Sequence, residues 1–353
     1  MTGTKDCFTR KNSGFYQANS GRNDKITYYK MNASSLDNLT KKNLKTVARR
    51  WQLKLKNIHE DIPIQGSPER SLFRVVLEDE IGRYFLLEQI PENFLERKKT
   101  IAATLDILSR NNLSRIQPYL ANEQDEFIIK YQNNFWQIAP FAEGIALNRE
   151  TYMYEQWRGK ALADFLIELR GKAKNLLSVN ADDVFSLKNY IYKLIREINL
   201  YNKNISAEIN SVAGFLEKEF LPAYNRLPMA FCHGDYHPLN IIWSDNGIKC
   251  VIDWEFCGYK SELYDAALLI GCIGVEDPQA LTGDLVKSFI AGMKEAKIIS
   301  KASWQYLVEF IVALCFAWLA EWLRQKDKEM IRLELDYMRL LTENKDNLEK
   351  AWS

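Results

Sequence analysis

Hydrophobic and polar positions follow two different periods within the first 140 residues. Steps of three and four residues predict helices, and alternation of apolar and polar positions predicts strands. The first helix begins after Ser35, whose hydroxyl is a typical N-cap group. The expected elements are helices over 36–58 and 92–110 and two hairpins, formed by 73–78 with 83–90 and by 126–132 with 135–141. This order predicts a small antiparallel sheet with a helix packed against it.

Beyond residue 143 the helical period dominates. We expect helices over 157–177, 186–202, 205–224 and 303–345. One short non-helical stretch, residues 230–255, lies between them. By contrast, residues 1–35 are rich in Ser, Asn, Thr, Gly and Lys and lack a hydrophobic period. We expect them to form a mobile N-terminal arm.

Charge and hydropathy argue against a nucleic-acid-binding or membrane protein. The 353 residues carry 47 basic and 46 acidic side chains, a net charge of +1, which gives no electrostatic reason to expect a nucleic-acid or membrane partner. The basic stretch 41–56 fits the solvated face of an amphipathic helix better than an RNA site. The apolar run 310–320 is shorter than the about 20 residues that span a membrane, so it predicts a buried helix.

The cysteines indicate the compartment. None of the six forms a C-x-x-C pair, the clustering that a zinc site needs. Most lie in apolar runs, where a free thiol acts as a small hydrophobic group. The N-terminal residues include no apolar stretch typical of a signal peptide. We therefore expect a reducing environment and a cytoplasmic protein.

The stretch 230–255 carries the candidate chemistry. Its Asp245-Asn246-Gly247 sequence between two apolar runs is a strong hairpin signal. With Asn246 and Gly247 at the centre of the turn, Asn240 lies directly opposite Asp253, with Cβ atoms about 4.5–5.5 Å apart. A carboxylate and an amide oxygen at that separation can share a hard cation such as Mg²⁺.

The loop before this hairpin supplies His233, Asp235 and His237. A candidate base, two oxygen ligands and no nucleophilic Ser or Cys in the cluster favour phosphoryl transfer, which needs positioning and charge neutralisation more than covalent catalysis. A metal-hydrolase site built on the same three residues is one alternative, although such sites usually recruit more histidines. A purely structural hydrogen-bond cluster is another.

These residues resemble a known family. The motifs closely resemble those of the aminoglycoside phosphotransferase and choline kinase superfamily over about 231–272, and they read His233-Gly-Asp235-x-His237-x-x-Asn240, Ile252-Asp253-Trp254-Glu255 and Tyr264-Asp265. The resemblance implies an α+β, protein-kinase-like fold with two lobes. A small antiparallel-sheet N-lobe would cover residues 36–140, and a mainly helical C-lobe would cover 141–353.

The same resemblance implies roles for individual residues and two cofactors, ATP and Mg²⁺. Asp235 would be the catalytic base, and Asn240 and Asp253 would bind Mg²⁺. His233 would brace the loop, and Asp265 would tie the next helix to it. His237 and Glu255 would be supporting residues.

The sequence departs from that family at the third strand, where a lysine usually holds the α- and β-phosphates. Here the position falls near Leu87, Glu88 or Gln89. Lys98 lies on the inward face of the next helix, and a buried lysine rarely lacks a partner. We therefore consider an exchanged ion pair of Glu88 with Lys98, whose ammonium still reaches phosphate. The alternative is that Lys98 extends to solvent and Gln89 makes a weaker contact.

The segment 66–70 occupies the place of the phosphate-covering loop. Gly66 and Ser67 would line the nucleotide site there, and Arg70 could supply a cation to phosphate. A plain surface turn is the alternative, because the segment contains only one glycine.

The expected function is ATP- and Mg²⁺-dependent transfer of phosphate to a hydroxyl of a small-molecule alcohol. Choline or ethanolamine, a sugar, an amino alcohol and homoserine all remain open as acceptors, and oligomeric state cannot be read from the sequence. One alternative is a pseudokinase, favoured by the missing strand lysine and disfavoured by the complete Asp235, Asn240 and Asp253 set. Another is an aminoglycoside-modifying resistance enzyme.

Two tryptophans raise a further possibility. Trp318 and Trp322 lie four residues apart on a predicted helix with Glu321, a spacing that could form an aromatic box for a quaternary ammonium. Trp254 and Glu255 could complete such a box. Core packing of a long apolar helix is the alternative that we favour.

Overall fold

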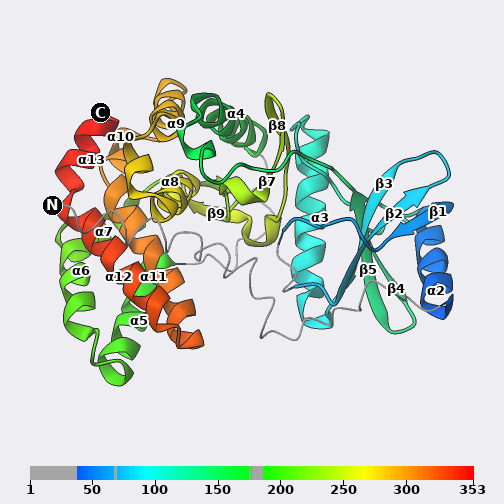
Figure 1. Cartoon of the computed structure of the whole chain (residues 1–353), viewed down its shortest axis with the longest axis horizontal. Coiled ribbons are helices and arrows are strands. Elements are labelled where there is room, and N and C mark those ends of the chain that lie inside the picture. The colour runs from blue at the N-terminus through cyan, green and yellow to red at the C-terminus, as the bar shows by residue number, and fades with distance from the viewer. Residues whose placement is uncertain (1–37, 67–69, 175, 177–185) are drawn as a thin grey trace.

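The N-terminal part of the protein is a five-stranded antiparallel sheet with helices on both sides (Figure 1). The computed structural model describes residues 38–66, 70–174, 176 and 186–353. The strand order is β1-β2-β3-β5-β4. The elements of this part are α2 (Asn38–Ala48), η1 (Arg49–Trp51), β1 (Leu55–His59), β2 (Phe73–Asp79), β3 (Tyr84–Ile90), η2 (Glu92–Phe94), α3 (Leu95–Arg110), β4 (Ile128–Tyr131) and β5 (Asn134–Pro140).

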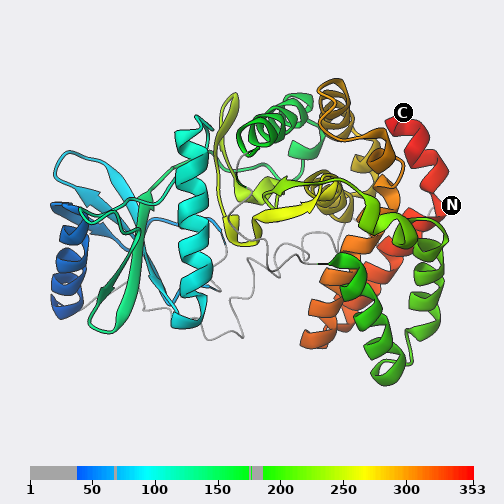
Figure 2. The same cartoon turned by 180° about the vertical axis from the view of Figure 1, so that it is seen from behind.

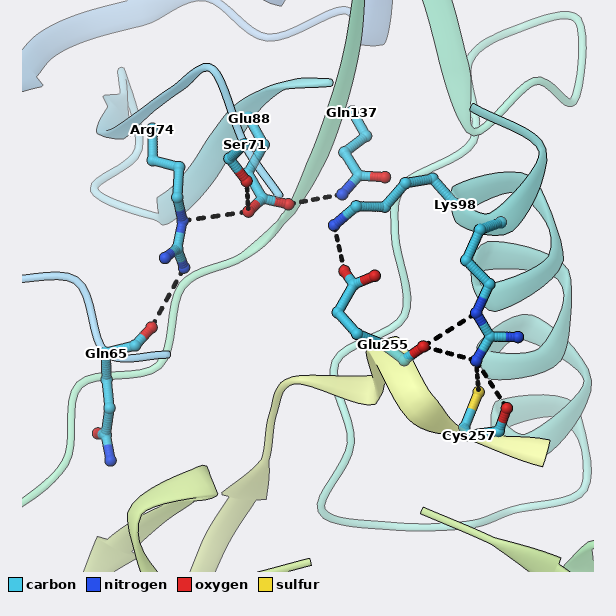
Figure 3. A network of polar contacts seen from close by, with 9 residues as sticks. Gln65, Ser71, Arg74, Glu88, Lys98, Gln137, Glu255 and Cys257 are labelled. Carbon is cyan, nitrogen blue, oxygen red and sulfur yellow. Dashed lines mark hydrogen bonds and ion pairs between the residues drawn. The ribbon is translucent and has the colours of Figure 1, made fainter. Parts of the chain in front are cut away.

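Alternation along the strands gives the sheet two different faces. Val75, Leu77 and Leu87 point to one face and form a core with Leu44 and Val47 of α2. The intervening positions of β2, β3 and β5 point to the opposite face, toward α3 (Figure 3). The sheet therefore has an apolar face under α2, and its other face carries charged side chains such as Arg74 and Glu88 among apolar ones.

The helix predicted over 36–58 is wrong in its second half. The helical segments α2 and η1 end at Trp51, and residues 55–59 form β1, the edge strand that pairs with β2. Lys56 and Asn57 of this strand donate hydrogen bonds to Glu78 of β2. These cross-strand contacts decide the conformation of a stretch whose apolar spacing also suits a helix. The predicted arm, residues 1–35, lies outside the described residues.

The C-terminal part is mainly helical. Its elements are η3 (Tyr152–Tyr154), α4 (Gln156–Lys172), α5 (Leu187–Tyr201), α6 (Ser206–Lys218), α7 (Phe220–Ala223), η4 (Tyr224–Arg226), β6 (Met229–Cys232), η5 (Pro238–Asn240), β7 (Ile241–Ser244), β8 (Gly247–Val251), η6 (Trp254–Phe256), β9 (Gly258–Ser261), α8 (Tyr264–Glu276), η7 (Pro278–Thr282), α9 (Asp284–Glu295), α10 (Lys301–Trp304), α11 (Leu307–Gln325), α12 (Lys328–Glu343) and α13 (Lys345–Trp352). This arrangement confirms the predicted α+β class.

Several predicted helices are shorter than expected. Residues 303–345 form parts of four helices, and the break after α11 falls at Lys326, which has φ 59°, followed by Asp327, whose carboxylate caps α12 at Met330. The 205–224 helix divides at Glu219, and the 157–177 helix ends at Lys172. Hydrophobic periodicity continues across these breaks because the successive helices bury their faces in the same core.

The α11 helix includes the apolar run 310–320, and most of that run is buried, as predicted. Among the described residues, none of the helices combines the length and hydropathy that a transmembrane segment requires. The predicted division between lobes at residue 140 stays a prediction, and the last strand of the N-terminal sheet ends there at Pro140.

The two parts meet along α3, which lies between the sheet and the β7–β8 hairpin (Figures 1 and 2). Two short antiparallel pairs, β6–β9 and β7–β8, form the nearest portion of the C-terminal part. The non-helical stretch therefore extends to Ser261, beyond its predicted end at 255, because β9 pairs with β6. The loops of this stretch carry the candidate site.

Candidate active site

The loop 233–237 connects β6 to η5 in a tight turn. Gly234 has φ +83°, and a Cβ there would stand 2.1 Å from the carbonyl oxygen of Phe256. Only glycine therefore fits between the loop and η6. The Tyr236 hydroxyl donates to the Leu162 carbonyl, which fixes the other side of the loop to α4.

Asp265 holds the loop from the first turn of α8. Its side chain is buried, and its carboxylate accepts hydrogen bonds from the backbone N–H groups of His233 and Gly234, both at 2.8 Å. A carboxylate with two backbone donors forms stronger bonds than a neutral acceptor would. Asp265 thus links α8 to the loop that presents Asp235.

Both ring nitrogens of His233 are used inside the protein. Nε2 lies 3.0 Å from the Ile252 carbonyl oxygen, and the backbone N–H of Asp235 donates to Nδ1 at 3.2 Å. These partners assign the proton to Nε2. Burial lowers the pKa of His233, so the ring is neutral. Since neither nitrogen is available to a metal, the metal-hydrolase alternative is wrong. Among the described residues no cluster of three His, Cys, Asp or Glu side chains could hold a metal.

Asp235, the acid of the loop 233–237, is partly accessible, with 21% of its side chain exposed. Its Oδ2 accepts a hydrogen bond from Nδ2 of Asn240 at 3.0 Å, and its Oδ1 lies 3.7 Å from Nε2 of His237. Burial raises the pKa of Asp235, but the charge of His237 and the contacts with His237 and Asn240 outweigh it, so the pKa lies below its ordinary value. Asp235 is therefore an ionised acceptor at neutral pH.

The predicted register of the hairpin is wrong by one residue near the site. The strands pair Ser244 with Gly247 and Ile241 with Val251, and a bulge lies between Ile242 and Trp243. The Ile252 N–H donates to the Asn240 carbonyl, so Asn240 pairs with Ile252 and not with Asp253. A shift of one residue normally moves a side chain to the opposite face of a strand.

Asp253 does not continue the strand, since its backbone is left-handed with φ 63°. Its Oδ2 lies 4.0 Å from the point where a Cβ on Gly66 would stand. Gly66 itself has φ +97° and immediately precedes the undescribed residues 67–69. The carboxylate therefore points toward the segment between β1 and β2.

The donor types at this site fit Mg²⁺. Asn240 uses its Nδ2 to bond the carbonyl and carboxylate of Asp235, which leaves Oδ1 as the amide atom that can bind a cation. Together with Asp253 it would provide one amide and one carboxylate ligand. Mg²⁺ commonly takes one or two protein carboxylates and completes its shell with phosphate oxygens and water. Such a site needs no larger protein cluster.

A buried network of charged residues joins the N-terminal part of the protein to this region (Figure 3). Lys98 of α3, with 3% of its side chain exposed, forms an ion pair with Glu255 Oε1. The neighbouring Arg97 donates to the carbonyls of Glu255 and Cys257. Both basic residues therefore join α3 to η6, the segment just after Asp253.

The expected pairing of Glu88 with Lys98 is wrong as a direct ion pair. Glu88 forms its ion pair with Arg74, directly opposite on β2, at 3.1 Å, and it accepts hydrogen bonds from Ser71 at 3.0 Å and Gln137 at 2.5 Å (Figure 3). Burial raises the pKa of Glu88, but Lys98, Arg74 and these donors together lower it below its ordinary value. Glu88 is therefore ionised, and its negative charge is balanced within the network.

The alternative for Lys98 and Gln89 is also wrong. Lys98 is buried and does not extend to solvent. Gln89 lies on the α2 face of the sheet, where its amide bonds Asn134. Strand alternation explains this outcome, since Glu88 and Gln89 must point to opposite faces.

The segment 66–70 is described only at its two ends. Gly66 lies beside Asp253 and the Arg74 guanidinium, whose Nη2 is 3.8 Å from the Gly66 Cβ position. Arg70 stacks on the Phe256 ring, with Cζ 4.3 Å from its centroid. Ser67 lies outside the described residues. Gly66 therefore lies beside the candidate metal ligand, whereas Arg70 contacts η6.

Behind His237, a small cavity of about 40 Å³ lies between α8, α11 and α12. Trp318 lines it, but the other members of the predicted aromatic box do not. Trp254 packs against His233 with ring centroids 4.5 Å apart, and Glu255 is paired with Lys98. The predicted box of Trp318, Glu321, Trp322, Trp254 and Glu255 is therefore wrong.

Sequence reasoning missed the contributions of Arg74, Arg97 and Gln137. A signal for Arg74 was available, because continuing the β2–β3 hairpin from its turn places it directly opposite Glu88. The contacts of Arg97 and Gln137 join elements far apart in the chain, and no spacing within the sequence indicates them.

Comparisons with known proteins agree with this geometry. A family model described as "Phosphotransferase enzyme family" matches residues 63–298. A search of curated protein sequences finds no match. Three solved structures illustrate the similarity in fold: an aminoglycoside phosphotransferase from Alicyclobacillus acidocaldarius (12% identity, TM-score 0.63, covering 87% of this chain and 96% of that one), an amicoumacin kinase with AMP-PNP, Ca²⁺ and Ami (11%, 0.59, 86% and 93%), and a spectinomycin phosphotransferase with ADP and spectinomycin (15%, 0.59, 87% and 98%).

Proposed function

Because this chain belongs to the phosphotransferase enzyme family, we propose that it transfers the γ-phosphate of ATP to a hydroxyl group of a small-molecule alcohol. The observation that carries the proposal is the state of Asp235. It is an ionised, partly exposed carboxylate, and its orientation is fixed by Asn240 and by a loop that Asp265 anchors. A carboxylate of this kind can orient an attacking hydroxyl and accept its proton.

The nucleotide would bind between the face of the sheet that carries Arg74 and Glu88 and the candidate ligands Asn240 and Asp253. Asn240 and Asp253 would hold Mg²⁺, which when bound neutralises charge on the phosphates. The solved structures with AMP-PNP and Ca²⁺ and with ADP support nucleotide and divalent-cation binding by this fold.

We assign the role of the absent strand lysine to two cations. Arg74 lies beside Gly66 and Lys98 beside Glu255, so both stand next to the segments that flank Asp253. Glu88 and Glu255 balance their charge in the absence of nucleotide. A phosphate chain can supply the same balance, because Arg and Lys bind phosphate oxygens as readily as carboxylates. Arg74 and Lys98 would then position the nucleotide.

The test separates phosphate transfer from nucleotide binding. Asp235→Asn keeps the size and the Asn240 contact but removes the base. We expect turnover with ATP, Mg²⁺ and a panel of alcohols to fall by at least about 10²-fold, while ATP affinity measured by calorimetry stays within about threefold. Asp245→Asn, in the exposed turn between β7 and β8, is the matched control and should retain full turnover.

Two results would contradict the proposal. Turnover that survives Asp235→Asn removes this residue as the base. Nucleotide binding without transfer by the wild-type protein to any alcohol of the panel would favour the pseudokinase alternative.

A further inference from the structure

A second cavity lies on the face of the sheet that α2 covers, away from the candidate active site. Residues of α2, of β2 and β3 and of the β4–β5 hairpin line it, and its volume is about 160 Å³. A cavity of about 150 Å³ is large enough to hold benzene. A molecule built on one six-membered ring therefore fits in this cavity.

The lining combines aromatic rings with carboxamides. The rings and amides include those of Phe73, Tyr131, Trp136, Gln89, Gln132 and Asn134. Among the described residues that line the cavity, none is Asp, Glu, Lys, Arg or His. A charged ligand would lose its hydration there without gaining an ion partner, whereas aromatic rings pack well on flat rings and carboxamides bond groups that both donate and accept. The lining therefore favours an uncharged flat ring that carries an amide.

Three polar groups of the lining remain available to such a ligand. Nε2 of Gln89 donates to Oδ1 of Asn134 at 2.9 Å, which orients both amides. The described residues offer no further side-chain hydrogen bond to Oε1 of Gln89 or Nδ2 of Asn134. Trp136 is 7% exposed, and its indole N–H has no hydrogen-bond partner among the described residues. A buried donor without an acceptor costs free energy, which an acceptor on a ligand would recover.

The cavity lies directly behind the charged network of the candidate site. The cross-strand register places three of its residues in one row across β2, β3 and β5, namely Phe73, Gln89 and Trp136. The adjacent row, one residue further along each strand, consists of Arg74, Glu88 and Gln137. This second row points to the opposite face, where its side chains form the network (Figure 3). A ligand in the cavity therefore contacts the strands where they hold Arg74 and Glu88.

We propose that this cavity is an effector site for a small uncharged molecule with a flat ring and an amide group, and that its occupancy changes the affinity for nucleotide. The ring would pack against Phe73 and Tyr131, and the amide carbonyl would accept a hydrogen bond from the Trp136 indole. The ligand class is independent of the proposed phosphotransferase function, whereas the effect on nucleotide rests on it.

Arg74 provides the link between the two faces of the sheet. Without nucleotide it pairs with Glu88 at 3.1 Å, and in the proposed function it turns to phosphate when nucleotide binds. A ligand that binds one of two arrangements more tightly shifts the equilibrium toward it. Because coupling between two binding sites is reciprocal, nucleotide should change effector affinity by the same factor as effector changes nucleotide affinity.

The first experiment measures binding to the full chain without nucleotide. Benzamide and nicotinamide would be compared with benzoate and nicotinate, which keep the rings and replace the amide by a carboxylate. Two-dimensional NMR follows the indole N–H signals of the nine tryptophans, and the Trp136 signal is the one that disappears in Trp136→Phe. We expect the amides to move this signal and to bind at least about tenfold more tightly than the carboxylates. No movement with either amide, or equal affinity within both pairs, would overturn the proposal.

Variants then assign the binding to the cavity. Trp136→Phe keeps a ring but removes the N–H, and it should weaken benzamide at least about fivefold. Trp352→Phe removes the indole of α13 that bonds the Leu281 carbonyl, and as the control it should leave the affinity unchanged. If Trp136→Phe impairs folding, Asn134→Asp at an exposed position keeps the acceptor for Gln89 and adds a charge, so it should weaken benzamide similarly in calorimetry. Unchanged affinity in either folded variant of the lining would contradict the proposal.

The second experiment measures the coupling. The affinity for AMP-PNP with Mg²⁺, measured by calorimetry, should differ at least about fivefold between zero and saturating benzamide. An unchanged affinity would overturn the effector role. A chain that binds no nucleotide would overturn the proposed function and the effect on nucleotide together, whereas the ligand class is decided by the first experiment alone.

Discussion

The two charged regions of the candidate site are built in opposite ways. The region from His233 to Asp265, which includes the loop 233–237, is assembled from residues close in sequence, and backbone groups fix most of its polar side chains. The network of Arg74, Glu88, Lys98 and Glu255 joins residues from β2, β3, α3 and η6 through side-chain pairs. The first arrangement can be read from local spacing, whereas the second depends on how distant elements pack.

The largest effect on turnover is expected at Asp253, in the region assembled from residues close in sequence. Asp253 has a left-handed backbone conformation, so its side chain does not follow the direction of β8. Asp253→Ala removes its carboxylate. We expect Mg²⁺-dependent ATP affinity to disappear and turnover to fall by about 10²- to 10³-fold, as for the loss of one preorganised charge-stabilising group. Calorimetry with and without Mg²⁺ measures this, with Asp245→Ala as the control. Unchanged Mg²⁺-dependent binding would refute the assignment of Asp253.

The next prediction concerns the partner of Lys98. A double-mutant cycle with Lys98→Met and Glu255→Gln should give a coupling free energy of about 1–3 kcal/mol in chemical unfolding, because the two buried groups are in direct contact. The cycle with Lys98→Met and Glu88→Gln should give a smaller value, since Glu88 pairs with Arg74. The reverse order would restore the exchanged pair that the sequence suggested.

Glu334, a fully buried acid on α12, adds a prediction about how the free energy of unfolding depends on pH. Its pKa is raised in the folded state to about 8, so the folded protein holds this proton where the unfolded chain has lost it. The free energy of unfolding should therefore fall as pH rises from about 5 to about 8, with a contribution of up to about 1.4 kcal/mol per pH unit from this group. Urea unfolding across that range should show this component in the wild type and not in Glu334→Gln. Parallel profiles would show that Glu334 does not titrate there.

The smallest effect is expected at Arg70. Its stacking on the partly exposed Phe256 ring is worth about 0.5–1 kcal/mol. Arg70→Ala should therefore change ATP affinity and unfolding free energy only slightly, by no more than about fivefold in affinity. Arg110→Ala, at the C-terminal end of α3, serves as the control. A loss of ATP affinity comparable to that of Asp253→Ala would assign Arg70 to phosphate binding.

The same contrast explains how much the sequence could predict. The family expected from the motifs over 233–265 is confirmed by the family model, and the α+β kinase-like fold is confirmed by the solved structures. The hairpin register was wrong because a bulge between Ile242 and Trp243 and the left-handed Asp253 are conformations that apolar alternation cannot reveal.

Other errors came from tertiary competition. Residues 55–59 have helical spacing but form an edge strand, because Glu78 offers hydrogen-bond acceptors to Lys56 and Asn57. Lys98 was correctly expected to be buried, yet its partner lies 157 residues away on η6. A single sequence does not indicate which of several acids such a lysine contacts.

The central claim is transfer of the terminal phosphate to a hydroxyl, and labelled phosphate tests it most directly. The wild-type protein would be incubated with ATP carrying a label on its γ-phosphate, with Mg²⁺ and the panel of small-molecule alcohols, and the products would be identified by mass spectrometry. The account predicts the label in a phosphate monoester of an alcohol, only when Mg²⁺ is present. Label that remains in ATP, or that appears only as inorganic phosphate, would contradict it.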